Sequence, residues 1–256
     1  MPRERININI GVSTTVVQGR EVKLPFPNCK ALAEIVQHKD DVQMDLEAYD
    51  IMIRGFIEIE VVKDKVIQRG RHEMRSFLNN LLRILLGFFS STFGVATTAK
   101  VIAVDGSSVE VNVSTWGSTN RDVPMACLAP SGTDAYGIVV GSGTTAVVLN
   151  QYNLASKIPH GTSSGQLSYG PTTVDDLGLD TSVTPPVYRF RITRSFSNLS
   201  GGDININEVG IVAAGFNLSL LTTYYFLIAR DVLPTTYIVP NGGSATVAIT
   251  IEVVVG

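Results

Sequence analysis

The sequence predicts a mainly β fold: an antiparallel β-sandwich of jelly-roll-like type, with one amphipathic helix packed on it and an extended N-terminal arm. Strand-forming runs recur about every ten residues, Gly-rich turns separate them, and a single stretch has a strong helical period. The 256 residues are enough for one large β domain or two smaller ones. We assign residues 1–55 to an arm and connecting region, and residues 56–256 to a sandwich domain that includes a helix over residues 72–89.

The N-terminal region begins with a strand pattern. Over residues 6–17 apolar and polar or small side chains alternate with a period of two, which predicts a half-buried strand. The apolar side of this strand consists of Ile6, Ile8, Ile10 and Val12. A terminal strand of this kind pairs with a sheet edge of its own chain or of a neighbour. Pro25 and Pro27 break the chain, and residues 29–36 could form a short helix.

The next segment predicts a hairpin and then the helix. Residues 55–69 predict a β-hairpin, because β-branched runs flank the polar tip Lys63-Asp64-Lys65. Residues 72–89 then have one apolar face at helical spacing, and Ile84 and Leu86 widen it. This face consists of Met74, Phe77, Leu78, Leu81, Leu82, Leu85, Phe88 and Phe89. The continuous apolar run is far shorter than the roughly 20 residues that cross a bilayer, so we expect a helix packed on a sheet and no membrane partner. A helix that lies on a membrane surface is the alternative.

Beyond the helix nearly every segment predicts strand, turn and strand. The Asp105-Gly106 turn indicates a hairpin, and residues 114–135 predict an exposed loop. Residues 159–171 predict a long loop, rich in Gly and Pro. The predicted strands cover residues 100–104, 109–113, 136–140, 146–149, 187–196, 204–213 and 224–229, with 237–239 and 245–255 as a final hairpin.

Charge and composition exclude some classes of protein and favour another. The formal net charge is −3 and the sequence pI is about 5.6, which does not indicate a nucleic-acid partner. Charged residues make up 17% of the chain, below the ordinary level of about 25%. A low charge density leaves more neutral surface that can be buried against other subunits. The N-terminus has no apolar signal-peptide core.

Two short motifs resemble catalytic or phosphate-binding sequences. Residues 161–165, Gly-Thr-Ser-Ser-Gly, match the pattern around a hydrolase nucleophile, which would make Ser163 the nucleophile. His160 directly precedes this motif. That motif needs a strand before it and a helix after it, and the sequence indicates no helix here. Residues 141–145 are rich in glycine, but they lack the Gly-Lys-Ser/Thr ending of a phosphate loop. We therefore predict a plain loop and a hairpin turn.

The remaining titratable residues give no catalytic argument. Asp175, Asp176 and Asp180 fall in one predicted loop and could bind Ca²⁺, although solvated acids are the commoner case. The histidines His38 and His72 lie in unrelated contexts. The sequence therefore predicts no catalytic residue, no cofactor and no metal, and we expect a protein that is not an enzyme.

Two cysteines, Cys29 and Cys127, are present without a metal-binding spacing. Two unpaired, buried thiols are the favoured interpretation, and a single disulfide between them is the alternative.

Several stretches of the second half, together with part of the predicted helix, form a recognisable set. They are residues 71–82, 137–147, 158–170, 193–198, 207–211, 225–234 and 239–243. Together they resemble a group of tailed-phage virion structural proteins. The resemblance covers roughly residues 60–256, and residues 1–55 have no part in it. The resemblance implies a place in a virus particle and carries over no functional residue.

Resemblance and composition together predict a structural subunit of a phage particle. We expect it to assemble with copies of itself and with other virion proteins, in the capsid surface or the tail, after synthesis in the host cytoplasm. The alternative is a receptor- or glycan-binding module on the virion. For that function the aromatic residues Trp116 and Tyr169, in predicted loops, would be the candidates for sugar stacking.

Overall fold

The computed structural model describes residues 13–17, 20–24, 52–89, 97–114 and 125–254, and it divides into two units, Met1–Tyr49 and Asp50–Gly256. In the first unit, β1 (Ser13–Val17) and β2 (Arg20–Leu24) form an antiparallel hairpin. The predicted strand over residues 6–17 is therefore observed in its last part, paired with the next strand of its own unit. Its beginning and the predicted helix over residues 29–36 lie outside the described residues.

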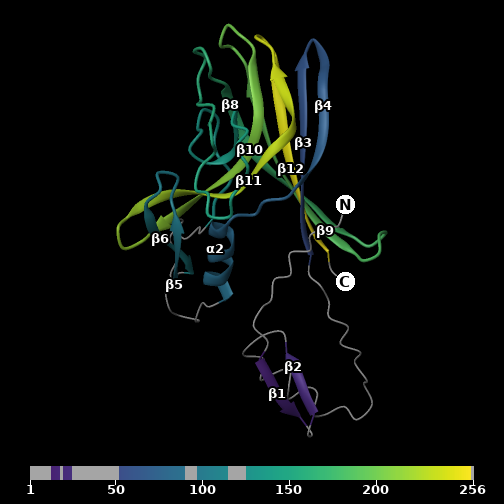
Figure 1. Cartoon of the computed structure of the whole chain (residues 1–256), viewed down its shortest axis with the longest axis vertical. Helices are drawn as coiled ribbons and strands as arrows, with labels where there is room; N and C mark the ends of the chain where they lie inside the picture. Colours follow the sequence, from purple (N-terminus) through teal and green to yellow (C-terminus); the bar gives the residue numbers. More distant parts are fainter. Residues whose placement is uncertain (1–12, 18–19, 25–51, 90–96, 115–124, 255–256) are drawn as a thin grey trace. The chain divides into compact units, whose positions relative to one another are not determined.

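Among its described residues the second unit contains two larger antiparallel sheets and a two-stranded one over residues 97–114 (Figure 1). Five strands form one sheet in the order β4-β3-β12-β9-β8, and three form the other in the order β11-β10-β7. The strands of the first sheet are β3 (Met52–Lys63), β4 (Lys65–Met74), β8 (Ser168–Asp180), β9 (Val187–Ser197) and β12 (Ser244–Val254). Those of the second are β7 (Gly137–Gly141), β10 (Ile204–Asn217) and β11 (Thr222–Val239).

The two sheets share one hydrophobic core. Along β3 and β12 alternate side chains point to it, so that Ile57, Ile59 and Ile249 are 0% exposed. From the other sheet Val209 and Phe226 belong to the same buried cluster. The opposite face of the five-stranded sheet is polar and contains ion pairs such as Arg71–Glu58 and Arg191–Glu58. The prediction of a mainly β, antiparallel fold with an amphipathic helix is therefore confirmed for the described residues.

Two predicted hairpins are confirmed. β3 turns into β4 at Asp64, whose φ of 61° is the left-handed conformation that Asp tolerates in tight turns. β5 (Thr97–Ile102) pairs with β6 (Ser108–Ser114) around the Asp105-Gly106 turn. There the carboxylate of Asp105 accepts a hydrogen bond from the backbone N–H of Ser107.

The helix is shorter than the sequence predicts. α2 covers Asn79–Phe89, and the prediction is wrong for residues 72–78. β4 continues to Met74, and the chain then pairs with β11 through hydrogen bonds from Leu78 N–H to the carbonyl of Ile228 and from Arg230 N–H to that of Ser76. Met74 and Leu78 are buried there, so apolar residues that fit a helical face instead complete the edge of a sheet.

The carboxylate of Asp231 holds this crossing segment. It accepts hydrogen bonds from the backbone N–H groups of Arg75 and Ser76 and from the hydroxyl of Ser76. The segment therefore leaves β4 at a fixed point of β11.

Three further predictions are wrong. Residues 146–149 form no strand, because β7 pairs with β10 instead. Residues 168–180 form β8, although the sequence predicts loops there. The final hairpin does not form, because β12 lies between β3 and β9 while β11 pairs with β10. Both apolar runs of that predicted hairpin are strands, but they belong to different sheets.

Asp231 makes stability depend on pH. Burial raises the pKa of its carboxyl from 3.8 to about 6. Because the folded-state pKa lies above the unfolded value, its contribution is largest below about pH 4 and decreases as the pH rises to about 6, by roughly 3 kcal/mol. We expect Asp231→Asn to flatten the dependence of the free energy of unfolding on pH in that window, measured by urea titration. Asp64→Asn, at an exposed turn, is the control; parallel pH profiles of wild type and Asp231→Asn would refute the assignment.

Candidate functional site

A buried ion pair fixes the long loop between β7 and β8. Arg230 and Glu208 are both 0% exposed, and Nε of Arg230 donates to Oε2 of Glu208 over 2.6 Å. The guanidinium also donates to the side chain of Gln151 and to the carbonyl of Thr145. A charge pair out of water is stable only if its remaining donors and acceptors are satisfied, and here the loop satisfies them.

The glycine-rich residues 141–145 bind this carboxylate. Backbone N–H groups of Gly143, Ala155 and Ser156 donate to Glu208 over 2.7–3.1 Å. A side chain at Gly143 would place its Cβ 2.6 Å from that of Ala155, so the close approach requires glycine. The segment that looks like a phosphate loop therefore binds a carboxylate of its own chain, and the predicted hairpin turn is wrong.

Arg194 performs the same task for the loop before β7. Its side chain is 1% exposed and lies over the ring of Tyr169, with Cζ 4.8 Å from the ring centroid. Its guanidinium donates to backbone carbonyls of the loop before β7, of β7 itself and of β8. These carbonyls belong to Pro130, Thr133, Tyr136, Ile138 and Gly170. One cation thus positions three segments that the sequence separates.

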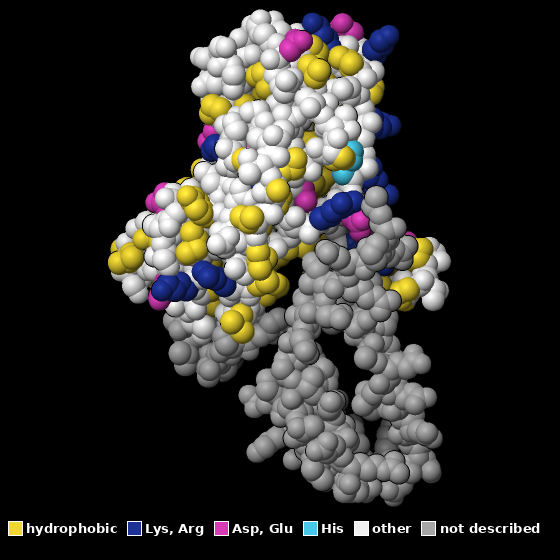
Figure 2. Space-filling model, viewed as in Figure 1, with side chains coloured by type: hydrophobic (Ala, Val, Ile, Leu, Met, Phe, Trp, Pro, Cys, Tyr) yellow, Lys and Arg dark blue, Asp and Glu magenta, His cyan; other side chains and the backbone are white. Residues whose placement is uncertain are grey.

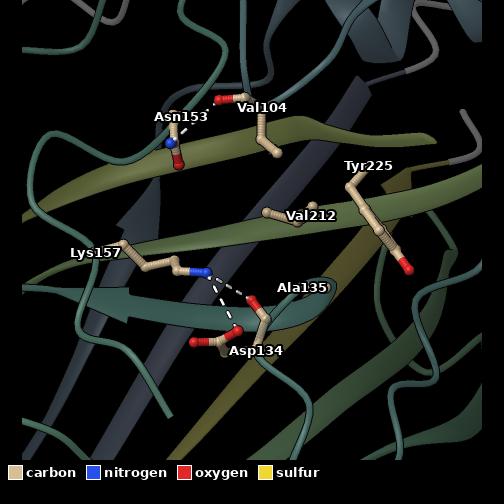
Figure 3. A pocket seen from close by; sticks show the side chains of 7 residues that line it. All are labelled: Val104, Asp134, Ala135, Asn153, Lys157, Val212 and Tyr225. Atoms are coloured by element: carbon tan, nitrogen blue, oxygen red, sulfur yellow. Dashed lines mark hydrogen bonds and ion pairs between the residues drawn. The ribbon is translucent and has the colours of Figure 1, made fainter.

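Between these loops lies a hollow of about 210 Å³ (Figure 3). Lys157 reaches to Asp134, with 3.4 Å between Nζ and Oδ1, and donates to the carbonyl of the same residue. Tyr225 forms another wall and stacks on Tyr136 at 5.8 Å between ring centroids. Asn153 lies across the hollow from the ion pair. The amide of Asn153 donates to the carbonyl of Val104 and accepts from the N–H of Leu154, so the lining offers a ligand an aromatic face and an ion pair.

The serine motif does not form a hydrolase site. Residues 161–165 form turns, and β8 follows at Ser168, so no helix is present to support Ser163. Nδ1 of His160 accepts a hydrogen bond from the backbone N–H of Tyr169, and the backbone N–H of His160 donates to Asp134. These contacts brace the loop.

The three loop acids lie on strand β8, and each has its own surroundings. Asp176 accepts a hydrogen bond from the hydroxyl of Tyr188, and Asp180 forms an ion pair with Arg189. The hydrogen bonds from Ser182 and Arg189 lower the pKa of Asp180 to about 2. Within the part of the chain that the structure describes, no group of His, Cys, Asp and Glu side chains could hold a metal ion.

The other candidates are placed as follows. Tyr169 is 1% exposed and donates to the carbonyl of Ile158, so it cannot stack on a sugar. His72 lies against Tyr237, and burial lowers its pKa. Cys127 forms no disulfide within the described residues, and burial raises the pKa of its thiol to about 12. Trp116, Cys29 and His38 lie outside the described residues.

Exposed apolar side chains gather on projecting elements of the second unit. Leu82 and Leu86, one turn apart on α2, are 41% and 68% exposed. Figure 2 shows hydrophobic side chains over this helix, and the loop with Val148 and Leu149 lies against its first turn. Leu220, at the tip between β10 and β11, is 64% exposed. The sequence indicated this exposed surface, because Leu86 widens the apolar face of the helix beyond the part that packing on one sheet can bury.

A further apolar surface lies at one end of the five-stranded sheet. Ile53 pairs with Val253, Val253 with Tyr188 and Tyr188 with Leu179, which makes one row across four strands. Ile53 and Tyr188 lie four residues from the buried Ile57 and Ile192, hence on the core face. Yet Ile53, Tyr188 and Leu179 are 41%, 38% and 57% exposed. We call Ile53, Val253, Tyr188 and Leu179 the sheet-end row.

Comparisons with protein-family models, with curated proteins and with solved structures found no match. The resemblance to tailed-phage virion proteins therefore stays a prediction from the sequence. Among the described residues no helix is long and apolar enough to span a membrane.

The Arg230–Glu208 pair is testable by removing one partner. We expect Glu208→Ala to lower the free energy of unfolding by about 3–5 kcal/mol, because it leaves a buried guanidinium and three loop N–H groups without their acceptor. The exposed Glu73→Ala is the matched control, with a change below about 0.5 kcal/mol. Urea unfolding of both variants measures the difference; equal stabilities would contradict the role assigned to the pair.

Proposed function

We propose that this chain is a structural subunit of a phage particle, which assembles with copies of itself and with other virion proteins. The support is the apolar surface that the fold leaves uncovered: α2, the β10–β11 tip and the sheet-end row. An isolated monomer rarely exposes contiguous apolar patches of this kind unless they meet a partner. The rigid loops, each fixed by a buried arginine, supply a surface that every copy would present in the same shape.

The single observation that carries the proposal is the sheet-end row. Its side chains continue the core face of the sheet, where apolar residues are expected to be buried. The opposite face of the same strands carries an ion-pair network, in which Arg189 bridges Asp180 and Glu252. The sheet therefore has an apolar face and a polar face up to its end, and we infer that a second molecule binds the exposed end of the apolar face.

A second candidate function is recognition of a small polar ligand, such as a glycan of a receptor. The observation that favours it is the hollow between Lys157, Asn153 and Tyr225. Titration of the protein with monosaccharides, followed by NMR shifts of residues around the hollow, tests it. Shifts that Lys157→Ala abolishes would support this function, and unshifted spectra at millimolar sugar would rule it out for those sugars.

The size of the purified protein over a concentration series tests the main proposal. Light scattering and negative-stain microscopy should show rings, tubes, shells or a defined large oligomer. A monomer at every concentration, which also fails to bind purified particles, would overturn the proposal.

The apolar surface of α2 gives a sharper test. We expect Leu86→Lys to weaken assembly about tenfold, since a side chain that is 68% exposed in one copy would otherwise be buried in the contact. The control is Val66→Lys, at the exposed β3–β4 tip beside Lys65. Sedimentation velocity compares the association constants. If both variants assemble like the wild type, α2 is not part of the contact.

A further inference from the structure

The outer half of β8 is an open sheet edge. β8 pairs with β9 on one side. On its other side, the first residues are covered by the loop before β7, through hydrogen bonds from Gly132 N–H to the carbonyl of Tyr169 and from Thr172 N–H to that of Ala129. Over residues 173–180 no further backbone hydrogen bond joins β8 to any described residue other than those of β9. Such an edge presents N–H and C=O groups to another strand.

This edge has two chemically different sides. Val174 pairs with the buried Ile192, and Leu179 belongs to the sheet-end row, so these two lie on the apolar side. Asp176 pairs with Phe190 on this same side, where its carboxylate is already engaged by the hydroxyl of Tyr188. Asp175 pairs with Arg191 and lies on the polar side, where it makes no ion pair within the described part of the chain. Two β8 edges would bring their own acids together, which disfavours pairing of β8 with itself. The complementary strand is apolar on one side and basic on the other.

The first twelve residues of this chain have that pattern. Ile6, Ile8 and Ile10 fall on one side of an extended strand, and Arg3 and Arg5 fall on the other. Added to the edge of β8, the isoleucines would extend the apolar side next to Val174 and Leu179. The arginines would then face Asp175. One orientation of the added strand therefore places both its isoleucines on the apolar side of β8 and its arginines on the polar side.

We propose that the edge of β8 over residues 173–180 binds residues 3–12 of a second copy as an added strand. The inference rests on the proposed function, because it names the contact through which copies assemble. Backbone hydrogen bonds would give affinity, and the alternating side chains would give specificity. Residues 25–51 separate β2 from β3, and an extended chain of this length spans up to roughly 90 Å, enough to reach a neighbour.

Disulfide trapping between two full-length chains tests the contact. Both chains carry Cys29→Ser and Cys127→Ser; one also carries Asn7→Cys and the other Thr173→Cys, and they differ in tag size. Asn7 and Thr173 both fall on the polar side of their strands, like Asp175. On mild oxidation of the mixture we expect a disulfide-linked pair of unequal chains on a non-reducing gel.

The matched charge variants decide whether the trapped contact is the proposed one. Asp175→Lys in the Thr173→Cys chain should lower the yield about fivefold, and Arg3→Glu with Arg5→Glu in the other chain should restore it. Glu73→Lys, on the opposite edge strand β4, should leave the yield unchanged. Absence of the linked pair, or equal yields for Asp175→Lys and Glu73→Lys, would overturn the inference.

Light scattering of the same chains separates the two proposals. Large assemblies without the disulfide would leave the proposed function standing and remove this contact. A disulfide-linked pair with no larger assembly would support the contact and contradict an assembling subunit. A third chain carries both Asn7→Cys and Thr173→Cys on the same cysteine-free background. If its disulfide forms only within single chains, and the mixture of the first two chains gives no linked pair, the edge belongs to the chain's own arm and the exchange between copies is overturned.

Discussion

The central constraint on this protein is that one face of a five-stranded sheet must be kept from water. β12 lies in the middle of that sheet, and its core face is apolar along its whole length. The facing residues of β3 and β9 are apolar too, apart from Gly55 and the buried Arg194. The three-stranded sheet buries most of this face but leaves the sheet-end row exposed. The described residues therefore bury this face only in part, and the exposed remainder is the main support for the proposed assembly.

The loops follow from the same constraint. β7, one edge of the second sheet, has only 5 residues, so the long connections before and after it run beside the core, where their polar backbone groups need partners. Arg194 satisfies carbonyl groups of the loop before β7, and the pair of Arg230 with Glu208 satisfies N–H and C=O groups of the loop after it. Buried charges therefore replace regular secondary structure there, and they give the loops one defined shape.

Sequence patterns predicted the strands well where a single alternation decides them, as in β3, β9 and β12. They failed where long-range pairing decides. Met74, Phe77 and Leu78 do have helical spacing. However, Met74 is buried at the end of β4, and pairing of the following segment with β11 buries Leu78. The acids and glycines of residues 168–180 are typical of a loop, and these residues form the strand β8 because they pair with β9. Nothing local distinguishes Arg194 or Arg230 from a surface arginine, because their partners are backbone groups far away in the chain.

The central claim is that the uncovered apolar surfaces become covered when copies meet. Hydrogen–deuterium exchange of the full-length chain at low and at high concentration measures this directly, segment by segment. We expect exchange to slow at high concentration in α2 and in residues 173–180, with no change in the β3–β4 tip around Asp64. Equal exchange rates at both concentrations in α2 and β8, in a sample that light scattering shows to be assembled, would contradict the account.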